Sequence, residues 1–163
     1  MSMTRRDFTR STAAAISLTV LGCDDKPKPT ASRNPDPNQA RGFTTEPIDA
    51  GTSDDFRDEG VHLNAITKGV FVVNAGGSLY AIFGKCTHNG CGVIWRPDDL
   101  RFECPCHAST FDPDGANQDG GKAKRPLDRC GITIDATGAV RVDPTVMYRS
   151  DQWTDPGAAA TLG

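Results

Sequence analysis

The sequence predicts a small all-β protein built from antiparallel strands. Short runs rich in Val, Ile, Phe and Tyr recur between residues 70 and 143, and turn-forming Gly, Asp, Asn and Pro separate them. No long segment has the 3.6-residue apolar period of an amphipathic helix. Once an N-terminal segment of different composition is set aside, roughly 100 of the 163 residues remain, which is enough for one small domain.

Three hairpins account for most of the predicted strands. They pair residues 70–73 with 78–83, 92–95 with 100–103, and 132–135 with 140–143. The connecting sequences NAGG, PDD and ATG supply residues that favour tight turns, and a DPDG turn follows at 112–115. The second hairpin is the informative one, because a Cys and a His lie in the loop on each side of it.

These two loops contain a potential set of metal ligands. The first loop offers Cys86 and His88, and the second offers Cys104 and His107. Two Cys and two His are the ligands of a 2Fe-2S cluster in which His replaces Cys on one of the two irons. Zinc uses the same donor atoms and is the alternative. Zinc folds usually take both Cys from one knuckle and both His from a helix, whereas each loop here offers one of each, so the spacing favours the iron-sulfur cluster.

Over about residues 61 to 143 these motifs resemble the Rieske iron-sulfur protein family. The resemblance implies a small antiparallel β-sandwich with a cluster-binding subdomain of two loops, and a Rieske-type 2Fe-2S cluster as cofactor. Cys86 and Cys104 correspond to the thiolate ligands of the inner iron. His88 and His107 correspond to the ligands of the outer, solvent-facing iron. Neutral imidazole donates less charge than thiolate, so such clusters work at roughly -150 to +300 mV.

Four further residues take their expected roles from the same resemblance. In the high-potential branch a second Cys in each loop forms a disulfide, and Cys91 and Cys106 occupy these positions; two buried free thiols are the alternative. Ser109 matches a serine whose hydroxyl hydrogen-bonds a bridging sulfide and raises the potential. Phe111 stands where high-potential members usually carry Tyr, whose phenol hydrogen-bonds a ligand thiolate, so we expect a lower potential. A plain loop hydroxyl for Ser109 and plain core packing for Phe111 are the alternatives.

The N-terminus has the features of an export signal. Arg5 and Arg6 precede a weakly apolar run from Thr12 to Gly22, and Cys23 follows it, which is typical of a twin-arginine signal with a lipoprotein cleavage site. The run has about 11 residues, and a membrane-spanning helix needs about 20. We therefore expect a lipid on Cys23 to hold the protein at the periplasmic face of the inner membrane. A basic N-terminus with an incidental Cys is the alternative.

Composition divides the chain into four expected segments. Residues 1–23 are the signal segment, and residues 24–58, rich in Pro, Asp, Asn, Thr and Ser, are a disordered tether. Residues 59–146 form the Rieske domain, and residues 147–163 are a C-terminal tail. Within the domain we expect Cys130 to be a small core residue rather than a ligand.

The expected function is one-electron transfer in an exported, membrane-anchored protein, as a subunit or partner of a respiratory oxidoreductase of the quinol:cytochrome c reductase type. A small Rieske subunit of an arsenite-oxidase-like molybdenum enzyme is one alternative, and a zinc-stabilised interaction module without redox activity is another. Catalysis is expected only within an oxidoreductase complex. The expected partners are a cytochrome or another redox-protein acceptor, a quinol-oxidising or molybdenum-containing large subunit, and the membrane. The formal net charge of -3 argues against nucleic acid and is compatible with docking to a basic patch on a partner.

Overall fold

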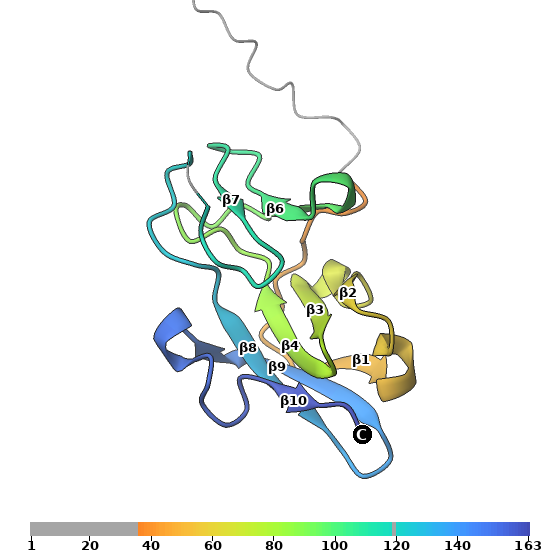
Figure 1. The fold of residues 1–163 in the computed structure, drawn as a ribbon. Coiled ribbons are helices and arrows are strands. Elements are labelled where there is room, and N and C mark those ends of the chain that lie inside the picture. Colours follow the sequence, from red (N-terminus) through yellow and green to blue (C-terminus); the bar gives the residue numbers. More distant parts are fainter. Residues whose placement is uncertain (1–35, 119) are drawn as a thin grey trace, which may run out of the picture. The chain divides into compact units, whose positions relative to one another are not determined.

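The structure is a computed structural model, and it describes residues 36–118 and 120–163 (Figure 1). The signal segment, including Arg5, Arg6 and Cys23, lies outside the described residues. The described part is all-β, as the sequence predicts, with ten strands in two antiparallel sheets. Its helical segments are short 3-10 turns, and none is long and apolar enough to cross a membrane.

The larger sheet has the strand order β1-β9-β8-β4-β3-β2, and β10 pairs with β4 (Figure 1). Its strands are β1 (Ile48–Thr52), β2 (Gly60–His62), β3 (Val70–Ala75), β4 (Ser78–Phe83), β8 (Arg129–Ile134), β9 (Ala139–Tyr148) and β10 (Ala160–Thr161). The hairpins β3–β4 and β8–β9 are those predicted around 74–77 and 136–138. Strand β9 extends further than the predicted 140–143, because a register shift at Cys130/Gly131 lets pairing with β8 continue to its end.

The smaller sheet consists of β5 (Ile94–Arg96), β6 (Arg101–Glu103) and β7 (Thr110–Phe111). Strands β5 and β6 form the predicted second hairpin, around a 3-10 turn at Pro97–Asp99. One Cys and His loop enters β5, and the other connects β6 to β7. The hairpin therefore fixes where the first loop ends and where the second begins.

A hydrophobic core shared by both sheets supports this hairpin. Phe71 of β3 and Ile82 of β4 belong to the same cluster of buried side chains as Trp95, Phe102 and Phe111 of the smaller sheet. The ring centroids of Phe71 and Phe102 lie 4.9 Å apart, and those of Trp95 and Phe102 lie 4.8 Å apart. Burying one such side chain stabilises the fold by about 1.5–3 kcal/mol. The core thus holds the two loops against the larger sheet.

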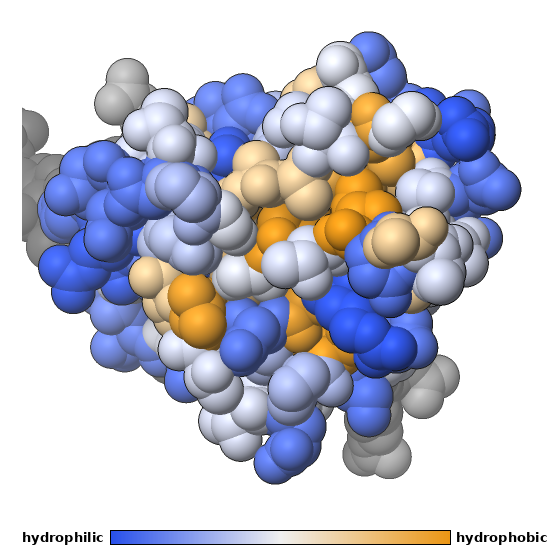
Figure 2. All heavy atoms as spheres, turned by 90° about the horizontal axis from the view of Figure 1, so that it is seen from below, coloured by the Kyte–Doolittle hydropathy of each residue, from blue (hydrophilic) through white to orange (hydrophobic). Residues whose placement is uncertain are grey.

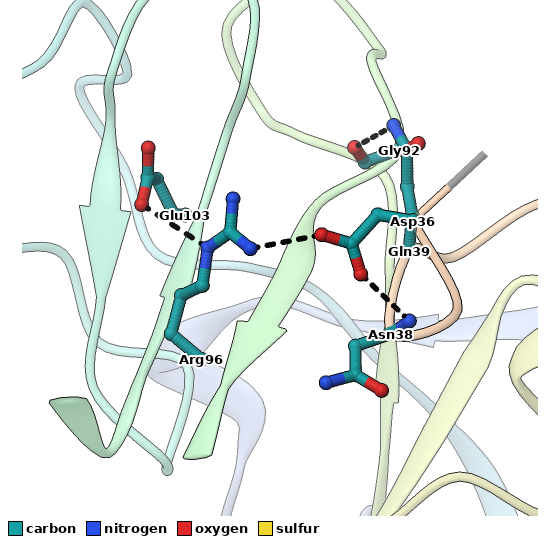
Figure 3. A network of polar contacts seen from close by, with 6 residues as sticks. All are labelled: Asp36, Asn38, Gln39, Gly92, Arg96 and Glu103. Carbon is teal, nitrogen blue, oxygen red and sulfur yellow. Dashed lines mark hydrogen bonds and ion pairs between the residues drawn. The ribbon is translucent and has the colours of Figure 1, made fainter. Parts of the chain in front are cut away.

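The expected tether boundary at residue 58 is wrong, because residues 36–58 belong to the domain. Residues 36–40 lie along β5, where the Ala40 amide donates to the Val93 carbonyl (2.9 Å) and the Trp95 amide donates to the Asn38 carbonyl (3.0 Å). Figure 3 shows Arg96 between Asp36, 2.8 Å from its Nη1, and Glu103. The polar composition predicts a solvated chain. Pairing at the edge of a sheet, however, is made by backbone hydrogen bonds, so it requires free N–H and C=O groups on the edge strand and no apolar side chains in the added segment.

Strand β1 corrects the same boundary at the other end of the segment. It pairs with β9, and its Ile48 and Ala50 are each 5% exposed while Asp49 between them is exposed. This alternation is that of a strand with one buried face. These two apolar residues are too few to stand out within a run rich in Pro, Asp and Thr. The expected tether residues 24–35 lie outside the described residues.

The C-terminal residues 147–163 also differ from the expected separate tail. Strand β9 ends only at Tyr148, and β10 pairs with β4. Trp153 lies between these two strands in the sequence. The guanidinium of buried Arg129, in β8, lies over the rings of Tyr80 and Trp153, at 3.6 and 4.2 Å from their centroids. Cation–π contacts of this kind attach the C-terminal segment to the sheet.

Figure 2 shows the domain from below the view of Figure 1. On this face, apolar side chains gather between hydrophilic ones. A hollow of about 240 Å³ lies over β8 and β9, and Ile132, Val142 and Val146 are among its lining residues. None of its lining residues comes from the Cys and His loops. The hollow and the candidate metal centre are thus separate features.

Candidate metal centre

The two Cys and His loops share one backbone pattern. In the first loop the Cys86 amide donates to the Cys91 carbonyl, and the Gly90 amide donates to the Cys86 carbonyl, both at 2.8 Å. In the second loop the Cys104 amide donates to the Ser109 carbonyl (2.8 Å), and the Ala108 amide donates to Cys104 (2.9 Å). The fourth residue after each first Cys has a left-handed φ, +74° at Gly90 and +52° at Ala108. Each loop is therefore a tight turn closed on its own Cys.

Both first cysteines are free thiols buried at the base of these turns. Cys86 is 3% exposed and Cys104 is 1% exposed, and both belong to the shared core. Burial raises the pKa of Cys104. Its sulfur accepts hydrogen bonds from the Cys106 and His107 amides, which act in the opposite direction, and contact with the Cys86 thiol raises the pKa further. The two thiols are thus adjacent and face each other.

The two histidines are brought together at the outer end of the loops. The ring centroids of His88 and His107 lie 4.6 Å apart with the rings nearly perpendicular, at 86°. Both side chains are partly exposed, yet the Nδ1 atoms of both are buried and have no hydrogen-bond partner among the described residues. An unpaired buried polar atom costs about 1–3 kcal/mol. Two such nitrogens and two free thiols, all contributed by the same two loops, have the chemistry of a metal site.

A disulfide ties the two loops together. Cys91 is bonded to Cys106, with Cα atoms 6.6 Å apart, as the family resemblance implies. The sulfurs of Cys91, Cys104 and Cys106 lie within 4.8 Å of one another. Two of these sulfurs are bonded to each other, so only Cys104 of this trio keeps a free thiol. A crosslink across 15 residues is worth about 3 kcal/mol in the chain-entropy model.

A third loop, residues 117–127, covers the site and was not singled out from the sequence. The Ala123 amide donates to the Oγ of buried Ser109 (3.0 Å), and the Thr87 hydroxyl donates to the Arg125 carbonyl (2.7 Å). A Cβ at Gly121 would lie 2.1 Å from the Ser109 Cα. The loop has no ligand motif, and the Gly120-Gly121 pair was its only signal of a close backbone approach.

Residues 46–144 of the chain match the family model described as the Rieske [2Fe-2S] domain. The chain belongs to the Rieske [2Fe-2S] domain family. A Rieske domain binds a 2Fe-2S cluster, and the donors described above fit that cofactor: two adjacent buried thiols and two orphaned imidazole nitrogens. This match supports the iron-sulfur expectation over the zinc alternative.

Two curated relatives of this Rieske chain are named as iron-sulfur subunits of the cytochrome b6-f complex. The cytochrome b6-f complex iron-sulfur subunit 2 of Trichormus variabilis is 37% identical over 75 residues, which are 46% of this chain and 38% of the relative. The cytochrome b6-f complex iron-sulfur subunit 3 of Nostoc sp. is 55% identical over 72 residues, 44% of this chain and 36% of the relative. The chain thus covers less than two fifths of the length of either relative.

A solved structure with the same domain is the cyanobacterial plasma membrane Rieske protein PetC3 from Synechocystis PCC 6803. It has 30% sequence identity and a TM-score of 0.44, and the similarity covers 58% of this chain and 97% of that one.

Other residues considered from the sequence lie away from the centre or in supporting positions. Phe111 is fully buried in the core beside the two free thiols. Cys130 is fully buried, as expected of a core residue, and burial raises its pKa to about 12. His62 packs against Phe56, and its Nε2 lies 2.9 Å from the Asp58 carbonyl oxygen.

Proposed function

We propose that this protein is a one-electron carrier whose cluster is held by four side chains: Cys86, Cys104, His88 and His107. The observation that carries the proposal is the pair of buried Nδ1 atoms without a hydrogen-bond partner among the described residues, on two histidines whose ring centroids lie 4.6 Å apart. When bound, the cluster takes up and releases one electron at a time. Two thiol and two imidazole donors are the set that distinguishes it from all-Cys ferredoxin clusters.

The surrounding residues have defined tasks in this function. The thiol end lies in the apolar core, which excludes water, and the partly exposed imidazole end is where electrons enter and leave. Ser109 accepts the Ala123 amide through an oxygen lone pair, so its O–H hydrogen stays available to donate to a cluster sulfide. The Cys91–Cys106 disulfide fixes the distance between the loops.

The proposed setting is the outer face of the inner membrane. Arg5 and Arg6 direct export through the twin-arginine route, and lipidated Cys23 is the anchor. Because residue 36 is already fixed along β5, the tether comprises residues 24–35, which span at most about 40 Å when extended. The domain is thereby kept within reach of a quinol-oxidising membrane complex, a partner suggested by the names of the relatives, and of a cytochrome acceptor.

Film voltammetry of the purified, iron-loaded protein tests electron transfer. We expect a reversible one-electron wave, together with two irons and two acid-labile sulfides per chain. Bound zinc, or iron-loaded protein without a wave, would contradict the proposal.

Purification from solubilised membranes tests the partner. Recovery of the chain with a cytochrome b supports a quinol-oxidising complex. Recovery with a large molybdenum-containing subunit would contradict that partner while leaving the electron-carrier role intact.

A further inference from the structure

The loops around the histidine pair have the opposite charge to the protein as a whole. The formal net charge of the chain is -3. Residues 84–92, 104–111 and 120–127 contain four basic side chains and no carboxylate, and the four are exposed: Lys85, Lys122, Lys124 and Arg125. Three acidic residues directly adjoin these segments, Glu103, Asp112 and Asp128, and Asp119 of the third loop lies outside the described residues.

Three of these four basic side chains form no ion pair among the described residues, so their charge is available to a binding partner. Arg125 forms an ion pair with Asp128, with Nη2 3.0 Å from Oδ2. Lys85, Lys122 and Lys124 have no carboxylate partner among the described residues. We call these three residues the lysine rim.

The backbone fixes the lysine rim beside the histidines. The third loop is attached to the first by the hydrogen bond from Thr87 to the Arg125 carbonyl, and to the second by that from Ala123 to Ser109. Lys122 precedes Ala123, whose amide is bonded to Ser109, two residues after His107. On the other side, Lys85 lies along the loop of His88, since its Cε would be 2.9 Å from a Cβ at Gly90.

The carboxylates that adjoin these loops are engaged: Glu103 pairs with Arg96 (3.4 Å), Asp128 pairs with Arg125 (3.0 Å), and Asp112 accepts the Ala116 amide (2.8 Å). Other carboxylates belong to segments outside the loops. Those of the segment from β1 to β2 are Asp49, Asp54, Asp55, Asp58 and Glu59, and others at the far turn and the C-terminal segment are Asp135, Asp151 and Asp155. Charges farther apart than about 8–10 Å are largely screened at physiological salt. A molecule that approaches the histidine end is therefore governed by the lysine rim and not by the net charge.

We propose that the lysine rim is the docking surface for an acidic face of the redox partner at the histidine end. The inference rests on the proposed electron-carrier function. The negative net charge alone favours the opposite arrangement, in which this protein docks to a basic patch on its partner. Charge complementarity close to the exit of the electron raises the rate of productive encounter and selects the orientation that brings the partner to the imidazoles.

Oxidation by small complexes of opposite charge tests the sign of the local field. The reduced, full-length holoprotein is mixed in a stopped-flow instrument with anionic hexacyanoferrate(III) or with cationic tris(phenanthroline)cobalt(III). We expect the rate with the anion to fall as ionic strength rises, and the rate with the cation to rise. The reverse dependence would overturn the lysine rim while the electron-carrier function stands, whereas protein without a one-electron wave would overturn both.

Single neutral variants locate the effect. We expect Lys122→Gln to lower the rate with the anion at low salt by roughly threefold or more, and Lys85→Gln to act in the same direction. The matched control is Arg141→Gln, which removes one positive charge from β9, where Arg141 lies only 3.8 Å from Asp49. All variants are compared at equal cluster absorbance per chain. An Arg141→Gln effect as large as that of both lysine variants would overturn the proposal.

A polyanion tests the acidic partner directly. We expect poly-L-aspartate to slow oxidation of the wild-type protein at low salt by covering the histidine end. The inhibition should weaken severalfold in Lys122→Gln and stay unchanged in Arg141→Gln. Equal inhibition of all three proteins would show that polyanions bind elsewhere and would contradict the docking surface.

Discussion

At the scale of single residues, the histidines distinguish this site from an ordinary pair of buried thiols. The Nδ1 atoms of His88 and His107 are buried without a partner, although each ring is partly exposed. A surface imidazole normally finds water or a carbonyl, as His62 does at Asp58. The orphaned nitrogens fit the proposed role of both histidines as donors to one cofactor.

His107→Asn tests this explanation. Because the cluster would lose one of its four donors, we expect the iron content to fall to background and the visible absorbance to disappear. The control is His62→Asn, which replaces the third His of the chain outside the site and should keep both signals. Iron retained in His107→Asn would show that His107 is not a ligand.

Phe111→Tyr tests the tuning of the potential. Phe111 is fully buried in the core that contains both free thiols, so an added hydroxyl has a thiolate as a possible acceptor. A hydrogen bond that favours the reduced state by about 1 kcal/mol corresponds to roughly 40 mV for one electron. We expect film voltammetry to show an increase of this order. An unchanged or lower potential would mean that the hydroxyl does not reach a ligand sulfur.

At the scale of elements, three loops make the site and only two carry ligands. The third loop packs on Ser109 so closely that only Gly fits at residue 121, where a Cβ would meet the Ser109 Cα at 2.1 Å. That contact involves backbone, which cannot move aside cheaply. The loop therefore acts as a cover for the cluster-binding loops.

Gly121→Ala should displace this cover. We expect the free energy of unfolding to fall by about 1–3 kcal/mol through overpacking, and the potential to fall because Ser109 loses its position. Urea unfolding and voltammetry measure the two effects. In the control, Gly131→Ala, the atom nearest to the added carbon is the Val146 Cβ, at 3.2 Å, and the contacts lie in β8 and β9 away from the cluster-binding loops, so the potential should not change. Equal potentials for both variants would contradict the role of the cover.

At the scale of the whole molecule, the N-terminal segment joins the two sheets. Residues 36–40 lie along β5 of the smaller sheet, and β1 pairs with β9 of the larger one. Ala40, 2% exposed, is part of the shared core. The segment once expected to be a tether thus helps to hold the loop-bearing hairpin on the domain.

A chain shortened to begin at residue 41 should be less stable than one that begins at residue 36. It loses the backbone hydrogen bonds of Asn38 and Ala40 and the half-exposed Asp36–Arg96 ion pair. At about 1 kcal/mol for each of the two hydrogen bonds and less for the ion pair, we expect a loss of about 2–3 kcal/mol in urea unfolding. Superimposable unfolding curves would show that the segment does not contribute.

The sequence by itself determined the β class, the central hairpins and the family. Turn residues at fixed places between short apolar runs specify hairpins locally, and the Cys and His spacing in residues 86–91 and 104–109 is specific to one kind of cluster. These signals are contained in neighbouring residues, so no knowledge of the fold is needed to detect them.

Only the tertiary structure decided the extent of the domain, the cover over the site and the charge at its outer end. Residues 36–52 pair with strands 50 to 100 positions away in sequence, and backbone pairing of that kind leaves little trace in composition. The roles of Gly121 and of the lysine rim depend on contacts of the third loop with Ser109 and Thr87, which lie in the other two loops. Net charge sums over the chain, whereas an approaching partner meets only the side chains within a screening length of the histidines.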